Sequence, residues 1–361
     1  MTKKRLEYMD MVKGIGILGI VIMHSSTVPL QVIWWISSVA PPLFFLSSGM
    51  LIGRAGEPEK SRREVLKRKG RSLLLPFLYF SLLYILRDLL RALFGISDMG
   101  EVWAGVNDLA TLWGSSVLWF LPALFLAESI FIFWRKIFEG RKYAPVLTAA
   151  ACLVLTMVSF LANNALKPLE GFFLSEKLLY ASLCLIRTLL RAVYALPFVC
   201  AGYFLYEIFR AFWEGEKKIP FAGQLAGGAA LFLAGIPLSV INGYFDFRSL
   251  SFGDIPVLSY LSAMISFVGI VLICRSCKPV RPLMFFGKNS LIVMATHIDF
   301  YFLYIGLNLA NRINGFIPMG NRVFFFVNVI GVILLLEVLC ITVINRFFPF
   351  LLGRKRSRER S

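Results

Sequence analysis

The chain opens with MTKKRLEYMDMVKGIGILGIVIMHSS (residues 1–26), which points to the fold class of the protein. Residues 14–23 are apolar or glycine throughout, and the run passes directly into His24, one of only two histidines in the chain. An apolar helix of about 20 residues is what a bilayer core of roughly 30 Å requires. The stretch therefore predicts a membrane-spanning helix that carries a histidine into the apolar phase.

The same apolar character extends along the whole chain. Hydrophobic residues make up 58% of its 361 positions, 34 residues are Phe and the mean hydropathy is +0.74, whereas soluble domains contain roughly 45–50% apolar residues. We therefore predict an all-α polytopic membrane helical bundle of about 10 transmembrane helices. The predicted spans are 12–32, 34–53, 72–94, 115–134, 143–163, 189–209, 219–241, 257–274, 289–309 and 323–346.

Basic residues are distributed unevenly over the segments between these spans. The segments on one side of the membrane hold 27 Lys and Arg residues, and those on the other side hold six. Cytoplasmic loops carry such an excess of positive charge, so both termini are predicted to be cytoplasmic. We predict a transmembrane domain over 1–353 and a basic cytoplasmic tail over 354–361.

The net charge of +17 follows mainly from this topology. The basic residues are divided among six short segments, which favours contact with anionic membrane lipid and argues against a nucleic-acid partner. The six cysteines lie mostly within apolar runs, and Cys274 and Cys277 have no matching His or Cys partners. We therefore expect neither a metal site nor a redox motif.

Three ionisable residues of the first helix share one face. Asp10 lies 14 positions and Lys13 lies 11 positions before His24, which at 100° per residue are rotations of about −40° and +20°. At a rise of 1.5 Å per residue, His24 lies about 16 Å deeper in the membrane than Lys13. The glycines between them let neighbouring helices approach closely.

An ionisable group at this depth usually faces a protein interior or an aqueous cavity, so His24 is a functional candidate. Histidine suits proton transfer because it changes charge near neutral pH. The alternative is a neutral core histidine bonded to a backbone carbonyl. Lys13 either snorkels to the interface or binds a ligand, and Asp10 either orients Lys13 or caps the helix.

The stretch YMDMVKGIGILGIVIMH (8–24) resembles the opening of the acyltransferase-3 family of integral membrane acyltransferases, and within it the fucose-4-O-acetylase-like branch. Further similar stretches follow in the order that the family shows, and together they extend over about 290 residues. They are PPLFFLSSGMLIG (41–53), RKGRSLLLPFLY (68–79), WFLPALF (119–125) and FFGKNSLIVMATH (285–297).

The resemblance implies an O-acyltransferase of a bacterial cytoplasmic (inner) membrane. It implies transfer of an acyl group, usually acetyl, from cytoplasmic acetyl-CoA to a hydroxyl of a cell-envelope carbohydrate. His24 would act as general base for that hydroxyl, or would itself carry the acyl group. The acceptor glycan and the acyl chain are not specified by the sequence, and a homo-oligomer is left open.

The basic segment 54–71 is the candidate donor site. Acetyl-CoA is a polyanion, and this segment offers eight cations against three carboxylates, enough to concentrate an anionic donor. Many family members have Arg at the position of Lys13, and lysine lacks the bidentate fork of arginine for phosphate. Besides Lys13, we therefore predict that Arg68 and Arg71 bind the donor, from which pantetheine could reach His24. A purely topological charge run is the alternative.

Four residues are candidates for lining the acceptor side. Trp119, Asn289 and Ser290 either contact the substrate or only pack. His297 lies eight residues into the ninth predicted span, about 80° around the helix from Asn289. We expect His297 to contact the acceptor.

Further charges are embedded in the predicted spans. Arg87 and Arg91 share a face of the third span, where an ion pair with Asp88 is favoured over contact with the acceptor. Three other embedded charges should each have a partner, because burial of an unpaired charge is costly. They are Glu128, Arg191 and Glu337.

Embedded His, Arg and Glu residues are also typical of a transporter or flippase for a sugar or a lipid-linked glycan precursor. An acyltransferase should concentrate its polar groups in the first helix beside a basic cytoplasmic segment. A transporter should line a pathway that opens to both sides. A non-catalytic scaffold or sensor would leave the depth of His24 without a reason, so the sequence favours the acyltransferase.

Overall fold

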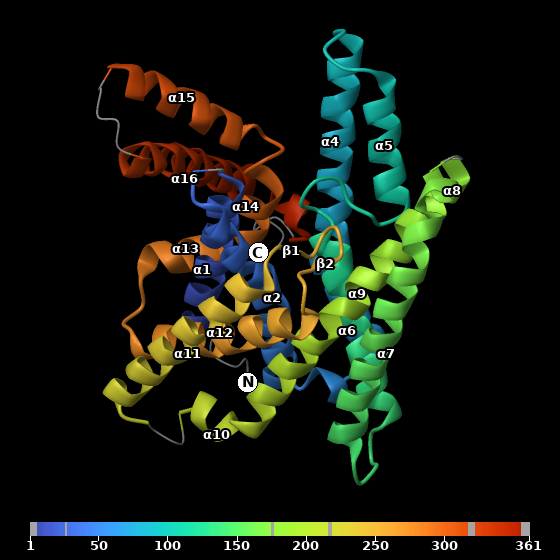
Figure 1. Cartoon of the computed structure of the whole chain (residues 1–361), viewed down its shortest axis with the longest axis vertical. Coiled ribbons are helices and arrows are strands. Elements are labelled where there is room, and N and C mark those ends of the chain that lie inside the picture. Colours follow the sequence, from blue (N-terminus) through green and yellow to red (C-terminus); the bar gives the residue numbers. More distant parts are fainter. Residues whose placement is uncertain (1–5, 26, 175–176, 216–218, 317–321, 355–361) are drawn as a thin grey trace, which may run out of the picture. The chain divides into compact units, whose positions relative to one another are not determined.

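The computed structural model is almost entirely helical (Figure 1). It describes residues 6–25, 27–174, 177–215, 219–316 and 322–354. The basic residues Lys3, Lys4 and Arg5 and the tail beyond residue 354 lie outside this part of the chain.

Seven helices in the described ranges are long and apolar enough to cross a membrane. They are Leu30–Ala55, Arg62–Leu93, Ala144–Phe173, Leu178–Ile208, Phe221–Asn242, Pro256–Ser276 and Arg322–Phe347. Two further predicted spans form helices of 18 residues, α1 (Glu7–His24) and α6 (Phe120–Ile137), each with three Asp, Glu, Lys or Arg residues. The predicted all-α polytopic membrane architecture is therefore confirmed.

The ninth predicted span, 289–309, is not one helix. A short helix, α14 (Ser290–Thr296), ends before His297, and the next helix, α15 (Phe302–Phe316), begins five residues later. Within the break, Tyr301 adopts a φ of 61°, a left-handed conformation that residues with a side chain rarely take. The prediction of a continuous helix is wrong here, because hydropathy shows that a segment is apolar and not that its backbone is helical.

The chain folds into two compact units. Unit 1 comprises Met1–Ser47 and Leu205–Arg346, and unit 2 comprises Ser48–Phe204 and Phe347–Ser361. Helix α2 (Leu30–Ala55) therefore begins in unit 1 and ends in unit 2.

Unit 1 is built around α1. It also contains α10 (Arg210–Trp213), α11 (Phe221–Asn242), β1 (Phe245–Asp246), β2 (Ser251–Phe252), α12 (Pro256–Ser276), α13 (Arg281–Lys288), α14, α15 and α16 (Arg322–Phe347). The closest helix pairs are α11 with α12 and α1 with α13, and α1 also contacts α12 and α14. Figure 1 shows α1 beside α13 and α14.

Two glycines bring the backbones of α1 and α13 into direct contact. A Cβ atom at Gly14 would lie 2.1 Å from the carbonyl oxygen of Leu283, and one at Gly287 would lie 1.7 Å from the carbonyl oxygen of Asp10. Any side chain at either position would therefore collide with main-chain atoms of the other helix. This contact fixes the position of α1, and with it the position of His24, in unit 1.

Unit 2 consists of the end of α2 and of the helices up to α9. Its elements are η1 (Glu57–Glu59), α3 (Arg62–Lys69), η2 (Gly70–Leu74), α4 (Leu75–Leu93), α5 (Met99–Ala110), α6, α7 (Ala144–Leu166), η3 (Lys167–Leu169), α8 (Glu170–Leu174), most of α9 (Lys177–Ile208) and η4 (Pro349–Leu352). The segment η2 is one turn of π-helix between α3 and α4, and such turns are frequent at functional sites.

Candidate functional site

The two histidines of the chain meet in unit 1. His24 is the last residue of α1, and His297 follows the last residue of α14. His24 Nδ1 lies 3.0 Å from His297 Nε2, and the ring centroids are 5.1 Å apart. His24 is half-buried, whereas His297 is only 1% exposed. The structure thus brings together two candidates that are 273 residues apart in sequence.

The partners of His297 determine the direction of this hydrogen bond. His297 Nδ1 lies 2.8 Å from the carbonyl oxygen of Val293 and 3.1 Å from that of Met294. A carbonyl oxygen only accepts, so Nδ1 of His297 carries the hydrogen and its Nε2 is the acceptor when the ring is neutral. His24 Nδ1 must then be the donor. The lone pair of neutral His24 is consequently on Nε2.

The residue before His297 is tied to α16. Thr296 Oγ1 lies 2.9 and 2.8 Å from the two carboxyl oxygens of Glu337 and 2.8 Å from the carbonyl oxygen of Ile292. Thr296 and Glu337 are both fully buried. The contact provides the partner that was expected for Glu337 and holds the end of α14 in place.

The hairpin between α11 and α12 brings further charges toward His24. Asp246 and Arg248 both interact electrostatically with the His24 ring. Neither residue was a sequence candidate, because the loop 243–255 looked like an ordinary connection between two spans. The alternation of apolar and polar residues in FDFR (245–248) was the available signal for a strand.

The other candidates in helix α1 are distant from this pair. Asp10 is 5% exposed and lies near the start of the helix, where its carbonyl oxygen faces α13. Lys13 is half-buried less than one turn further along. The rise of the helix separates both from His24 by about 16 Å or more, so the immediate surroundings of His24 come from α14 and the hairpin.

Asn289 and Ser290 occupy the junction of α13 and α14. Asn289 Nδ2 donates to the carbonyl oxygen of Phe285 at 2.8 Å, and Asn289 Oδ1 accepts from Asn345 Nδ2 at 2.9 Å. The bond with Asn345 connects the junction to α16. Ser290 is the first residue of α14.

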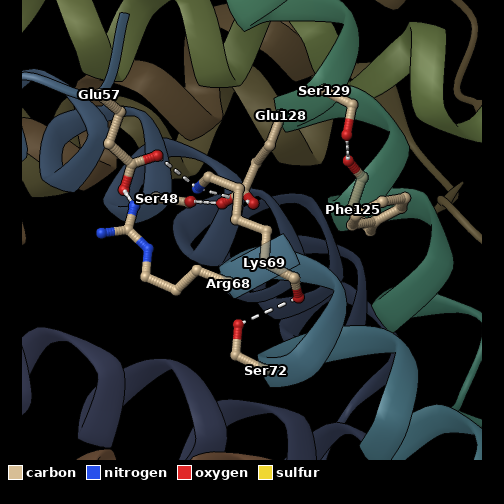
Figure 2. A network of polar contacts seen from close by, with 8 residues as sticks. All are labelled: Ser48, Glu57, Arg68, Lys69, Ser72, Phe125, Glu128 and Ser129. Atoms are coloured by element: carbon tan, nitrogen blue, oxygen red, sulfur yellow. Dashed lines mark hydrogen bonds and ion pairs between the residues drawn. The ribbon is translucent and has the colours of Figure 1, made fainter. Parts of the chain in front are cut away.

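The basic segment in unit 2 contains a buried ion cluster that sequence reasoning missed. Figure 2 shows Lys69 between two carboxylates: Lys69 Nζ lies 2.9 Å from Glu57 and 2.9 Å from Glu128. Ser48 donates a hydrogen bond to Glu128, and Arg68 pairs with Glu57. The Lys69 cluster, defined by these five residues, supplies the partner expected for Glu128.

The two predicted donor ligands lie on either side of Lys69 in sequence and remain accessible. The side chain of Arg68 is 50% exposed despite its pairing with Glu57. Arg71 is also exposed, and its Nε donates to the carbonyl oxygen of Gly353 at 2.9 Å. Lys69, by contrast, is 7% exposed and bound to carboxylates on both sides. Only part of this basic run can therefore meet an anion from solution.

Arg191 is almost fully buried and finds its expected partner in aromatic rings. Its guanidinium lies 3.4 Å from the ring centroid of Trp113 and 5.4 Å from that of Trp119, and Nη1 donates to the Trp113 carbonyl at 2.9 Å. Trp119, predicted to line the acceptor side, is 8% exposed and directly precedes α6. In this arrangement it packs beside a buried cation.

The two arginines of the third predicted span are paired. Arg87 Nε lies 2.8 Å from Asp88, and Arg91 lies 3.5 Å from Glu101 of α5. The ion pair with Asp88 that was favoured over acceptor contact is therefore present, although it involves Arg87 and not Arg91.

Comparison with known proteins identifies the family. Residues 6–342 match the family model described as an acyltransferase domain. No curated protein and no solved structure matches the chain. The match favours the acyltransferase over the transporter alternative, and the fucose-4-O-acetylase-like branch stays a prediction. Since the matched region covers nearly the whole chain, including both histidines, the protein belongs to the acyltransferase-3 family of membrane acyltransferases.

Proposed function

We propose that the protein transfers an acetyl or other short acyl group from acyl-CoA to a hydroxyl of a cell-envelope carbohydrate, with His24 as the general base. The observation that supports this role is the hydrogen bond from His24 Nδ1 to His297 Nε2. Because His297 Nε2 accepts the hydrogen of His24 Nδ1, the lone pair of His24 is held on Nε2, the atom that can receive a proton from a substrate.

The reaction is a single acyl transfer. His24 Nε2 takes the proton of the acceptor hydroxyl as the oxygen attacks the thioester carbonyl carbon. The C–O bond forms, the C–S bond breaks, and the leaving thiolate of CoA takes the proton from the His24 imidazolium. The products are an ester and free CoA, and His24 returns to its neutral state.

His297 acts as a positioning residue in this scheme. Its own Nδ1 hydrogen is bound to backbone carbonyls, so the ring has one orientation in which to accept from His24. Asp246 and Arg248 of the hairpin carry opposite charges, and both act electrostatically on His24. His297 thus fixes the tautomer and the orientation of the base.

We propose acetyl-CoA as donor, bound through the phosphates by Arg68 and Arg71, with both termini in the cytoplasm of a bacterial cell and the chain in its inner membrane. The exposure of these two arginines supports the donor assignment, since a bidentate guanidinium is well suited to phosphate. No metal is invoked.

The test uses membranes that contain the protein, labelled acetyl-CoA, and envelope glycan of the source organism from which ester-linked acetyl groups have been removed with alkali. His24→Ala should reduce label transfer by about 10²–10⁴-fold, the usual contribution of a positioned general base. Expression and melting temperature in detergent should stay at the wild-type level.

Asn308→Ala is the matched control, because Asn308 is exposed on α15 and its side chain donates to the Tyr304 carbonyl of its own helix. It should transfer label like the wild type. Transfer by His24→Ala at the wild-type rate would remove the proposed base, and absence of transfer by the wild type would remove the proposed acceptor class.

A further inference from the structure

The loop between α11 and α12 folds as a two-faced hairpin. Phe245 pairs with Phe252 and Asp246 with Ser251 in an antiparallel register. Side chains alternate between the two faces of such a strand. Phe245, Phe247 and Phe252 are 1%, 1% and 4% exposed, whereas Asp246, Arg248 and Ser251 are at least partly accessible.

The aromatic face anchors the hairpin within unit 1. Phe247 stacks on Phe45 of α2 with ring centroids 5.3 Å apart, and it contacts Phe252 at 5.5 Å. Phe45 lies 15 residues into α2, about 22 Å from the start of that helix. The hairpin therefore dips into the helical unit and is not a loop on its surface.

The base of the hairpin is clamped by Asn242, which is 1% exposed. Its Nδ2 donates to the carbonyl oxygen of Phe252 at 2.9 Å, and its Oδ1 accepts from the backbone of Ile255 at 2.7 Å. A Cβ atom at Gly253 would lie 2.1 Å from Asn242 Nδ2, and the φ of Gly253 is 72°. Both strands are thus held in place from the open end of the hairpin.

The opposite face, made of Tyr244, Asp246 and Arg248, is polar and points away from this anchor. Tyr244 is 52% exposed, Asp246 is half-buried and Arg248 is exposed. Asp246 Oδ1 accepts from the backbone N–H of Arg248 at 2.9 Å, and the Tyr244 hydroxyl lies 3.4 Å from Oδ2. Partial burial and the neighbouring Asp246 raise the pKa of Tyr244, so its hydroxyl stays a donor.

We propose that this polar face of the hairpin is the acceptor subsite and binds a polyhydroxylated sugar beside His24. The inference rests on the proposed function and adds the residues that hold the acceptor. A carboxylate accepts from two neighbouring sugar hydroxyls, a guanidinium donates to sugar oxygens, and an exposed tyrosine ring offers a flat surface for the C–H face of a pyranose.

The position of the hairpin gives this subsite its role. Asp246 and Arg248 are close enough to act electrostatically on His24, so a sugar held by them has a hydroxyl in the neighbourhood of the base. The buried phenylalanines hold the strand in one register, and register decides which side chains face His24. The hairpin would therefore select which hydroxyl of the acceptor is presented.

The experiment measures label transfer from acetyl-CoA to the alkali-treated envelope glycan at varied glycan concentration. Asp246→Asn and Tyr244→Ala should each raise the KM for glycan by about tenfold, as expected for the loss of one charge-assisted or stacking contact. The KM for acetyl-CoA should not change. Asn at position 246 retains an oxygen acceptor for the Arg248 N–H, which preserves the local fold.

Asp254→Asn is the control variant, since Asp254 is exposed in the same loop and the exchange removes the same charge. It should leave both KM values at the wild-type level. If Asp246→Asn lowers the melting temperature in detergent, Arg248→Gln replaces it, with the same expected rise in KM. Wild-type transfer together with an unchanged glycan KM in the hairpin variants would overturn the subsite alone. Absence of wild-type transfer would overturn the proposed function and the subsite together.

Discussion

The histidine pair of unit 1 and the Lys69 cluster of unit 2 hold their buried ionisable groups in different ways. In unit 2, Lys69 lies between two carboxylates, and Arg87 pairs with Asp88, so charge is met by opposite charge. In unit 1, His24 bonds to His297 and Glu337 bonds to a threonine hydroxyl, so an ionisable group is met by a partner that is neutral or itself titratable.

This difference separates stability from chemistry. Removing one member of a buried ion pair leaves the other charge without compensation, so neither protonation state nor sequence can vary freely. A histidine that donates to a neutral histidine keeps that hydrogen bond when its other ring nitrogen takes up a proton. The Lys69 cluster therefore holds fixed charges, and the histidine pair holds a group that can take part in proton transfer.

The largest effect on stability should come from Lys69→Met. The exchange leaves Glu57 and Glu128 buried side by side without their common cation and should lower the free energy of unfolding by about 3–5 kcal/mol. Thermal unfolding in detergent, followed by size-exclusion chromatography with fluorescence detection, measures the change. The double variant Lys69→Met/Glu128→Gln should recover most of the lost stability. Equal melting temperatures for Lys69→Met and wild type would show that Lys69 does not compensate the two carboxylates.

A smaller effect, on rate and not on stability, is expected for His297→Ala. Loss of the acceptor for His24 Nδ1 frees the tautomer and orientation of the base, and kcat for acetyl transfer should fall by about 10–100-fold, as for other groups that orient a reacting residue. His297→Gln, which offers a carbonyl oxygen to Nδ1 of His24, should restore part of the rate. Equal rates for both variants would show that the ring only fills space.

The smallest effect sharpens the comparison within unit 2. Arg68 is half exposed, so Arg68→Ala should change stability by less than about 1 kcal/mol. The KM for acetyl-CoA should rise by about three- to tenfold, because one phosphate contact is lost. Arg63→Ala is the control, since Arg63 is an exposed arginine of the same helix α3. A rise of similar size in the KM for acetyl-CoA in both variants would show that Arg68 contributes only to the general positive charge of the segment.

Much of the fold could be predicted because its signals are local. The hydropathy of each segment predicts a membrane helix, and the rotation per residue places Asp10, Lys13 and His24 on one face without reference to the rest of the chain. The partners of Glu128, Arg191 and Glu337 were expected for a general reason, the cost of burying a lone charge, although sequence could not say which residues they are.

The pairing of the two histidines could not be predicted from such local signals. It depends on a break in the ninth span that places His297 at the end of α14, and the segment 298–301 (IDFY) contains neither Gly nor Pro that would mark such a break. Lys69 could not be singled out from the sequence, because it is one of several Lys and Arg residues in the same segment. Only its packing between two carboxylates distinguishes it. Asp246 could not be identified either, because the hairpin that positions it packs against Phe45, which is distant in sequence.

The backbone contact between α1 and α13 has a mechanical consequence. With Gly14 against Leu283 and Gly287 against Asp10, neither helix can slide or turn against the other without a collision of main-chain atoms. Any movement of α1 must therefore carry α13 along with it as one rigid piece. The imidazole at the end of α1 consequently keeps its place relative to α13 in such a movement.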